Sequence, residues 1–132
     1  MSHTLSREIA MKRLYAETVG GEDTLSDALE QSECGALSDE DALFSDRLYT
    51  GVHAHLEEID REIEAHASGW SLNRIAKVEL SILRIAAYEL LFERAIPVGA
   101  TVNEAVELAK TFGDDKAPGF INGILGAIAK VH

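Results

Sequence analysis

Apolar residues occur on almost every side of the segment formed by residues 72–91. They are Leu72, Ile75, Val78, Leu80, Ile82, Leu83, Ile85, Ala86, Ala87, Leu90 and Leu91. A helix that is apolar all round is stable only when other elements cover it on every side. We therefore expect this segment to form the centre of a helical bundle, either as one helix or as two shorter helices bent near Lys77. Pro97 closes the region, because proline cannot continue a helix.

Helical periodicity covers most of the remaining chain, and no stretch alternates with the period of two that is typical of a half-buried strand. The spacing predicts helices over about residues 5–17, 24–34 and 38–66. Two more are predicted near the C-terminus, one that ends at Gly113 and one over residues 120–131. The expected fold class is therefore all-α.

The most regular amphipathic pattern covers residues 38–66, where apolar side chains recur at steps of three and four and predict one helix with a continuous stripe. Ser38 is a suitable N-cap for it. Gly51 lies inside the pattern at a cost of about 1 kcal/mol relative to alanine, which indicates a close helix contact. Gly119 and Gly123, four residues apart, predict a second close contact on the last helix.

Charge is divided unevenly between the two halves of the chain. Residues 1–66 contain sixteen acids and five cations, and residues 67–132 contain seven of each. This asymmetry is typical either of separate surfaces for separate partners or of helix faces kept acidic for solubility. The single cysteine, Cys34, cannot form an internal disulfide. No signal core or long apolar stretch is recognisable, so we expect a cytoplasmic protein without a membrane segment.

No pattern of catalytic or metal-binding residues is recognisable. His53 and His55 are two residues apart, so on a helix they point about 200° away from each other and cannot share a metal. Cys34 has no patterned histidine partner, and no glycine-rich phosphate loop is present. The adjacent Asp114 and Asp115 are expected in solvent, without an apolar pocket that would raise a pKa. We expect no enzymatic activity, no cofactor and no metal.

Two sequence blocks in the second half match a known family in order and spacing. They are Leu-Arg-Ile-Ala-x-Tyr-Glu-Leu at residues 83–90 and Asn-Glu-Ala-x-Glu-Leu-Ala-Lys at residues 103–110. Shorter matches include Trp70, Phe120-Ile121-Asn122-Gly123, Arg7-Glu8, Leu14-Tyr15, Phe44 and Gly51-Val52. The chain resembles the NusB family of transcription antitermination factors. The resemblance implies a compact bundle of about six to seven helices in one domain, residues 1–132, with an acidic subdomain of about residues 1–66 and a second of about 67–132.

The resemblance implies binding rather than chemistry. Family members bind the boxA element of nascent or ribosomal RNA as a heterodimer with the ribosomal protein NusE, within the RNA polymerase antitermination complex. Matching positions predict RNA contacts at Arg7, Lys12, Arg13, Phe120 and Asn122. They predict NusE contacts at Tyr15, Glu79, Asp114, Asp115 and Lys116.

The first helix departs from the family's pattern, since Ser2 to Ser6 stand where the family has consecutive basic residues. At about 100° per residue, Arg7, Lys12 and Arg13 do not form one patch. Gly119 replaces a lysine, and Lys116 stands where the family often has an aspartate. One alternative is therefore a divergent NusB-like protein that retains a protein interface but has lost boxA recognition. Another is the NusB-like domain of certain rRNA cytosine methyltransferases.

Several of these residues also have a purely structural interpretation. Tyr15 and Phe120 are apolar enough to be core residues. Glu79 can pair with Arg74 or Lys77 nearby on the chain. Arg84, on the mostly apolar segment, is predicted to be a partly buried guanidinium with its hydrogen bonds satisfied.

Overall fold

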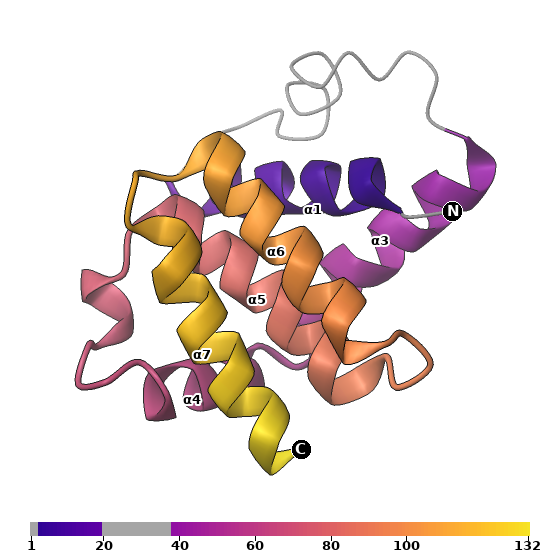
Figure 1. The fold of residues 1–132 in the computed structure, drawn as a ribbon. Coiled ribbons are helices and arrows are strands. Elements are labelled where there is room, and N and C mark those ends of the chain that lie inside the picture. Colours follow the sequence, from indigo (N-terminus) through magenta and orange to yellow (C-terminus); the bar gives the residue numbers. More distant parts are fainter. Residues whose placement is uncertain (1–2, 20–37) are drawn as a thin grey trace.

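The computed structural model describes residues 3–19 and 38–132, which contain helices and no strand. The elements are α1 (Thr4–Thr18), α3 (Asp39–Ala54), α4 (Leu56–Ala65), the 3₁₀ turn η1 (Leu72–Arg74), α5 (Lys77–Phe92), α6 (Val98–Phe112) and α7 (Ala117–Val131) (Figure 1). The prediction of an all-α fold is confirmed. The helix predicted over residues 24–34 and Cys34 lie outside the described residues. None of the described helices is long and apolar enough to cross a bilayer.

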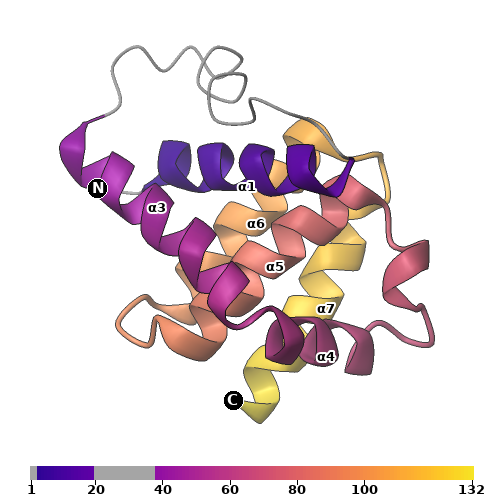
Figure 2. The ribbon, with the colours of Figure 1, turned by 180° about the vertical axis from the view of Figure 1, so that it is seen from behind.

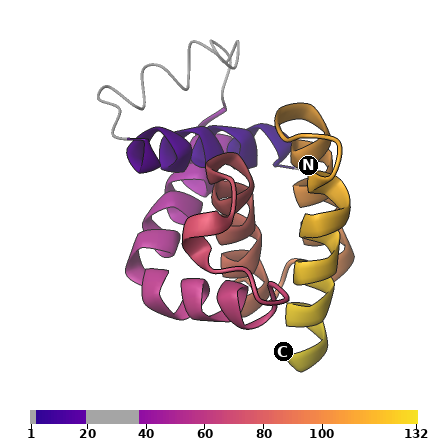
Figure 3. The same cartoon turned by 90° about the vertical axis from the view of Figure 1, so that its left-hand side faces the viewer.

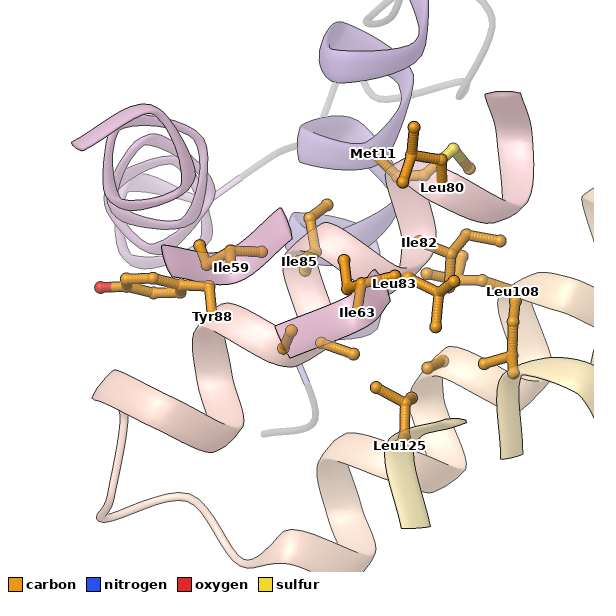
Figure 4. Close-up of a cluster of buried hydrophobic side chains, with 14 of the residues drawn as sticks. Met11, Ile59, Ile63, Leu80, Ile82, Leu83, Ile85, Tyr88, Leu108 and Leu125 are labelled. Atoms are coloured by element: carbon orange, nitrogen blue, oxygen red, sulfur yellow. The ribbon is translucent and has the colours of Figure 1, made fainter. Parts of the chain in front are cut away.

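Helix α5 lies at the centre of the bundle, as its apolar sequence predicts. Helices α3 and α4 pack on one side of it and α6 and α7 on the other, while α1 crosses one end (Figure 3). Its buried side chains extend toward both sides, where they meet Ile59 and Ile63 of α4 and Leu108 and Leu125 of α6 and α7 (Figure 4). Because α5 contacts helices from both halves of the sequence, the division into subdomains near residue 66 stays a prediction.

The bend expected near Lys77 is present, but the part of residues 72–91 before it forms a single 3₁₀ turn rather than a second, shorter α-helix. Leu72 to Arg74 form a 3₁₀ turn, and Ile75 and Ala76 are extended, with ψ of 130° and 141°. Helix α5 then begins at Lys77. This turn places the segment around η1 beside the start of α5, where it contributes to a pocket described below.

The prediction of one helix over residues 38–66 is wrong, because the helix is interrupted at His55 and the segment forms two helices, α3 and α4 (Figure 2). His55 has φ −123° and ψ 23°, and its ring stacks on Phe92 of α5 with centroids 3.9 Å apart. The break redirects α4 so that Ile59 and Ile63 are buried in the core. The apolar spacing continues across His55 without interruption, which is why the pattern alone does not reveal the break.

Of the two close helix contacts predicted from glycine residues, one is present and the other is not. A Cβ at Gly51 would lie 2.4 Å from the ring of Tyr88, so the predicted close contact between α3 and α5 is confirmed. A Cβ at Gly119 or Gly123 would meet no atom within 4 Å, and both residues are exposed. The predicted close contact on α7 is therefore wrong, since the two glycines lie on its outer face. Ser38 caps α3 as predicted, its Oγ accepting the Asp41 N–H at 3.1 Å.

Candidate partner and nucleic-acid interfaces

A pocket of about 270 Å³ lies where η1, the first turn of α5 and the start of α7 meet. It is lined by Trp70, Arg74, Ile75, Ala76, Glu79, Asp114, Lys116 and Phe120. We call it the α5–α7 pocket. Three of its residues, Glu79, Asp114 and Lys116, were predicted from the sequence to bind a protein partner, and Phe120 was predicted to contact RNA. The fold thus brings together side chains that are up to 41 positions apart in the sequence.

Glu79 is the most enclosed charged residue of the α5–α7 pocket, with only 8% of its surface exposed. Among the described residues it has no ion pair, so the predicted pairing with Arg74 or Lys77 is wrong. Burial raises the pKa of the Glu79 carboxyl, and the nearby charge of Asp114 raises it further. Glu79 is therefore a desolvated acid beside an open space.

Asp114 is held in place by the backbone at the start of α7. Its Oδ1 accepts the N–H groups of Lys116 at 2.9 Å and Ala117 at 3.0 Å, which satisfies donors that a helix start otherwise leaves unpaired. Asp115 and Lys116 are exposed. The loop before α7 therefore presents a carboxylate held by backbone N–H groups next to an exposed cationic residue.

Two aromatic rings line the pocket, together with the apolar residues Ile75 and Ala76. Trp70 is 49% exposed, and its ring meets that of Phe120 edge to face, with centroids 6.3 Å apart. Phe120 packs partly against the core, so it is neither fully a core residue nor free on the surface. Neither Trp70 nor Arg74 was predicted as a site residue. The available signal was the position of the chain's single tryptophan directly after Ser68-Gly69, a turn in which both residues have positive φ.

Arg7, predicted to bind RNA, is only 4% exposed and forms an ion pair inside the bundle. Its Nε and Nη2 donate to the two carboxylate oxygens of Glu89 at 2.8 and 2.7 Å. Nη1 lies 3.3 Å from Glu104, and the Thr101 hydroxyl donates to Glu89 at 3.0 Å. We call these four residues the α1–α5–α6 polar cluster. Glu89 and Glu104 thus occupy donors of Arg7 that an RNA phosphate would need, and its RNA contact stays a prediction.

The other two cations of α1 are also engaged with other residues of the protein. Lys12 donates to Glu8 at 3.0 Å and lies over the Phe112 ring. Arg13 donates to Asp46 at 3.1 Å and stacks on Tyr49, 3.7 Å from the ring centroid. Arg7 pairs with Glu89 of α5, so the three cations of α1 contact different neighbours, as expected from their angular separation.

The remaining predicted residues lie apart from one another. Tyr15 is 37% exposed, so its interpretation as a core residue is wrong and it stays a candidate for partner binding. Asn122 is exposed on α7 and forms no hydrogen bond with other described residues. Arg84 is bidentate to Asp60, with both distances 2.9 Å, which confirms it as a partly buried and satisfied guanidinium.

A sequence model described as the NusB family matches residues 4–130. The chain belongs to the NusB family. The transcription antitermination protein NusB of Geobacter sulfurreducens is 47% identical over 128 residues, which are 95% of this chain and 91% of that protein. The protein of the same name from Clostridium novyi is 37% identical over 133 residues, covering 98% and 99% of the two chains.

Solved structures of NusB proteins have the same fold. NusB from T. maritima superimposes with a TM-score of 0.85 at 37% identity, covering 98% of this chain and 92% of that one. A crystal structure of the antitermination factors NusB and NusE in complex with dsRNA matches with a TM-score of 0.86 at 29% identity, covering 99% and 98%. The predicted NusB-like bundle is thereby confirmed, while the roles of individual residues stay predictions.

Proposed function

We propose that this NusB-family chain is a cytoplasmic transcription antitermination factor that binds the ribosomal protein NusE and, together with it, boxA-type RNA. Through this complex it joins the RNA polymerase antitermination assembly. The observation that carries the proposal is the match over nearly its whole length to NusB in complex with NusE and dsRNA. Its action is binding rather than catalysis, in keeping with a family of antitermination proteins.

The α5–α7 pocket is the proposed centre of the NusE interface. It combines partly exposed aromatic rings with charged residues, of which Glu79 is buried and Asp114 and Lys116 are exposed. Such a composition is typical of energetically important interface residues. Glu79 and Asp114 supply the acids, and Lys116 is exposed beside them. Tyr15 and Asp115 extend the proposed interface beyond the pocket.

The proposed RNA surface carries few accessible charges on α1. Arg7, Lys12 and Arg13 are all engaged with carboxylates of this chain, and a phosphate must compete with those carboxylates. Even if all three contacted phosphates, the slope of log affinity against log salt would be only about −2 for a single strand. We therefore propose that Phe120 and Asn122 contact RNA mainly when NusE is bound and supplies further contacts.

Fluorescence anisotropy of a labelled boxA-type RNA tests this proposal. The RNA is titrated with the chain alone, with NusE alone and with an equimolar mixture, at two salt concentrations. We expect tight, salt-sensitive binding only with the mixture, and weaker binding of a scrambled RNA. Equal binding of the scrambled RNA would contradict boxA recognition.

A second candidate function is a NusB-like protein that binds a protein partner but no boxA RNA. The pairing of all three α1 cations favours it. The same titration separates the two functions, because this candidate predicts a complex with NusE that leaves the RNA anisotropy unchanged. Deleting residues 1–8 would be a poor test, since Ser6 and Arg7 are buried and the deletion would damage the fold. Asn122→Ala, at an exposed position, removes a predicted RNA contact without this complication.

A further inference from the structure

Every histidine of the chain lies within 4.0 Å of a carboxylate, and two of these contacts join α1 to α3. His3, directly before α1, has its Nδ1 3.2 Å from Oδ1 of Asp41 in the first turn of α3. His53, in the last turn of α3, has its Nε2 2.8 Å from Oε1 of Glu17 in the last turn of α1. Because α1 and α3 pack side by side, one pair lies at each end of their contact. We call these four residues the α1–α3 histidine clamp.

The pair at the start of the two helices is partly enclosed. The side chains of His3 and Asp41 are 24% and 21% exposed. Asp41 also accepts the Ser6 hydroxyl at 3.3 Å, and the His3 ring lies against that of Phe44, with centroids 4.2 Å apart. Burial acts to raise the pKa of the Asp41 carboxyl, but hydrogen bonds from its neighbours, His3 among them, hold the pKa below its ordinary value. Asp41 is therefore well suited to receive a protonated imidazole.

The pair at the other end is tied into a small polar network. Glu17 accepts the Tyr49 hydroxyl in addition to its contact with His53, and the rings of Tyr49 and His53 meet edge to face with centroids 4.8 Å apart. Burial raises the pKa of the Tyr49 hydroxyl, and the charge of Glu17 raises it further, so this phenol stays a donor. Arg13 of α1 stacks on Tyr49, but its charge is compensated by Asp46. The free charge that faces His53 is thus that of a carboxylate.

The charges near His3 also favour the protonated form of a histidine. Arg7 of α1 and Arg47 of α3 face the same Phe44 ring as His3, at 5.7 and 5.0 Å from its centroid. Each of these arginines has a carboxylate partner, and the pairs are Arg7 with Glu89 and Arg47 with Glu93. On α6, Glu104 accepts the hydroxyl of the residue that follows His3. Since residues 1–66 contain sixteen acids and five cations, a positive charge on His3 meets acidic surroundings.

Histidine is the side chain through which the clamp can respond to pH. It changes its charge between about pH 5 and 8, a range in which ordinary carboxyl groups stay ionised. A protonated imidazole forms a charge-assisted hydrogen bond with a carboxylate, which is about twice as strong as a neutral one. We infer that the α1–α3 histidine clamp holds α1 against α3 more tightly at about pH 6 than at about pH 8. Neither RNA nor NusE takes part in the clamp, so this inference is independent of the proposed function.

Hydrogen exchange followed by NMR measures how tightly α1 is docked. The exchange rates of backbone amides in α1 and α5 are recorded at the two pH values and compared with the intrinsic rates at the same pH, which gives protection factors. An exposed pair changes such an equilibrium by about threefold, and distant pairs add in free energy. We therefore expect protection factors in α1 about tenfold higher at the lower pH, with a smaller change in α5. Equal protection of α1 at both pH values, or an equal change in α1 and α5, would overturn the inference.

Variants assign the effect to the clamp. The double variant His3→Gln with His53→Gln keeps polar side chains that cannot be protonated, and we expect protection of α1 to change by at most about twofold between the two pH values. Glu17→Gln with Asp41→Asn keeps both histidines but removes the charges that they face, and the same loss of pH dependence is expected. His66→Gln is the matched control and is expected to keep the tenfold change, because the nearby carboxylate is on its own helix, α4. A tenfold change that persists in either double variant, in protein shown by circular dichroism to be folded, would contradict the clamp.

Discussion

Helix α5 carries two buried glutamates whose surroundings are opposite. Glu89, near its C-terminal end, is 2% exposed and accepts hydrogen bonds from Arg7 and Thr101. Glu79, in its first turn, is nearly as buried and has no partner among the described residues. The residue type, the helix and the degree of burial are shared, so the difference lies in what the neighbouring helices present.

The two glutamates therefore illustrate two uses of a buried charge. A buried carboxylate costs free energy unless it is paired, and the fold satisfies Glu89 from α1 and α6. At Glu79 the cost is not compensated within the described chain, and the group faces a pocket. The charge of a buried acid with its partners in place is compensated within the bundle, whereas one without them is available to a ligand.

The largest expected effect is on stability at the α1–α5–α6 polar cluster. Glu89→Ala leaves the buried Arg7 guanidinium without its bidentate partner, and we expect a loss of about 3 kcal/mol in the free energy of unfolding. Urea denaturation followed by circular dichroism measures this loss. Glu104, 3.3 Å from Arg7, remains as a weaker partner. A loss below about 1 kcal/mol would show that it replaces Glu89 and that the cluster is less important than its burial indicates.

Removing both charges sharpens the comparison. In the double variant Arg7→Leu with Glu89→Leu, no unpaired charge stays buried, so we expect at least about 2 kcal/mol of the Glu89→Ala loss to be recovered. The single variant Arg7→Leu is the control. If the double variant is as unstable as the singles, packing rather than charge pairing explains the effect.

A smaller effect is expected from one hydrogen bond of the same cluster. Thr101→Val keeps the shape of the side chain but removes the hydroxyl that donates to Glu89, which is expected to cost about 1 kcal/mol. Thr111→Val is the control, because among the described residues its hydroxyl donates to the backbone carbonyl of Glu107 alone, at an exposed site on α6. Equal losses in the two variants would argue against a special role for the cluster.

The smallest change in the free energy of unfolding is expected at Glu79, where a substitution should stabilise the protein rather than destabilise it. Because the folded state raises the pKa of Glu79, this group lowers stability as the pH rises through its folded pKa. Glu79→Gln is therefore expected to match the wild type at acidic pH and to exceed its stability at neutral pH. Thermal unfolding across this pH range measures the difference. A variant that is less stable than the wild type at neutral pH would mean that Glu79 has a stabilising partner.

The apolar pattern of the sequence predicted most of the helices and the bend near Lys77, but not the break between α3 and α4. The all-round apolar character of α5 placed it correctly at the centre, because only a covered helix tolerates such a surface. The break at His55 was missed, since the stripe of α3 and α4 continues in phase across it. At the break the His55 ring stacks on Phe92, a residue 37 positions along the chain, which no local pattern reveals.

The candidate site was predicted only in part, for a related reason. The family pattern singled out Glu79, Asp114, Lys116 and Phe120, which the fold gathers in one pocket. The family pattern could not show that Arg7 forms an ion pair inside the protein, because its partner Glu89 is 82 positions along the chain. A cation in a helix has the same appearance in a sequence whether it faces RNA or an acid on another helix.

The long sequence separation within the polar cluster also has a consequence for synthesis. Arg7 emerges from the ribosome early, but its partners on α5 and α6 follow 82 and 97 residues later. At bacterial translation rates this interval lasts about 5 to 20 s. During that time α1 can form as a helix but cannot complete its docking. The N-terminal helix is therefore among the last parts of this protein to reach its final contacts, although it is the first to be made.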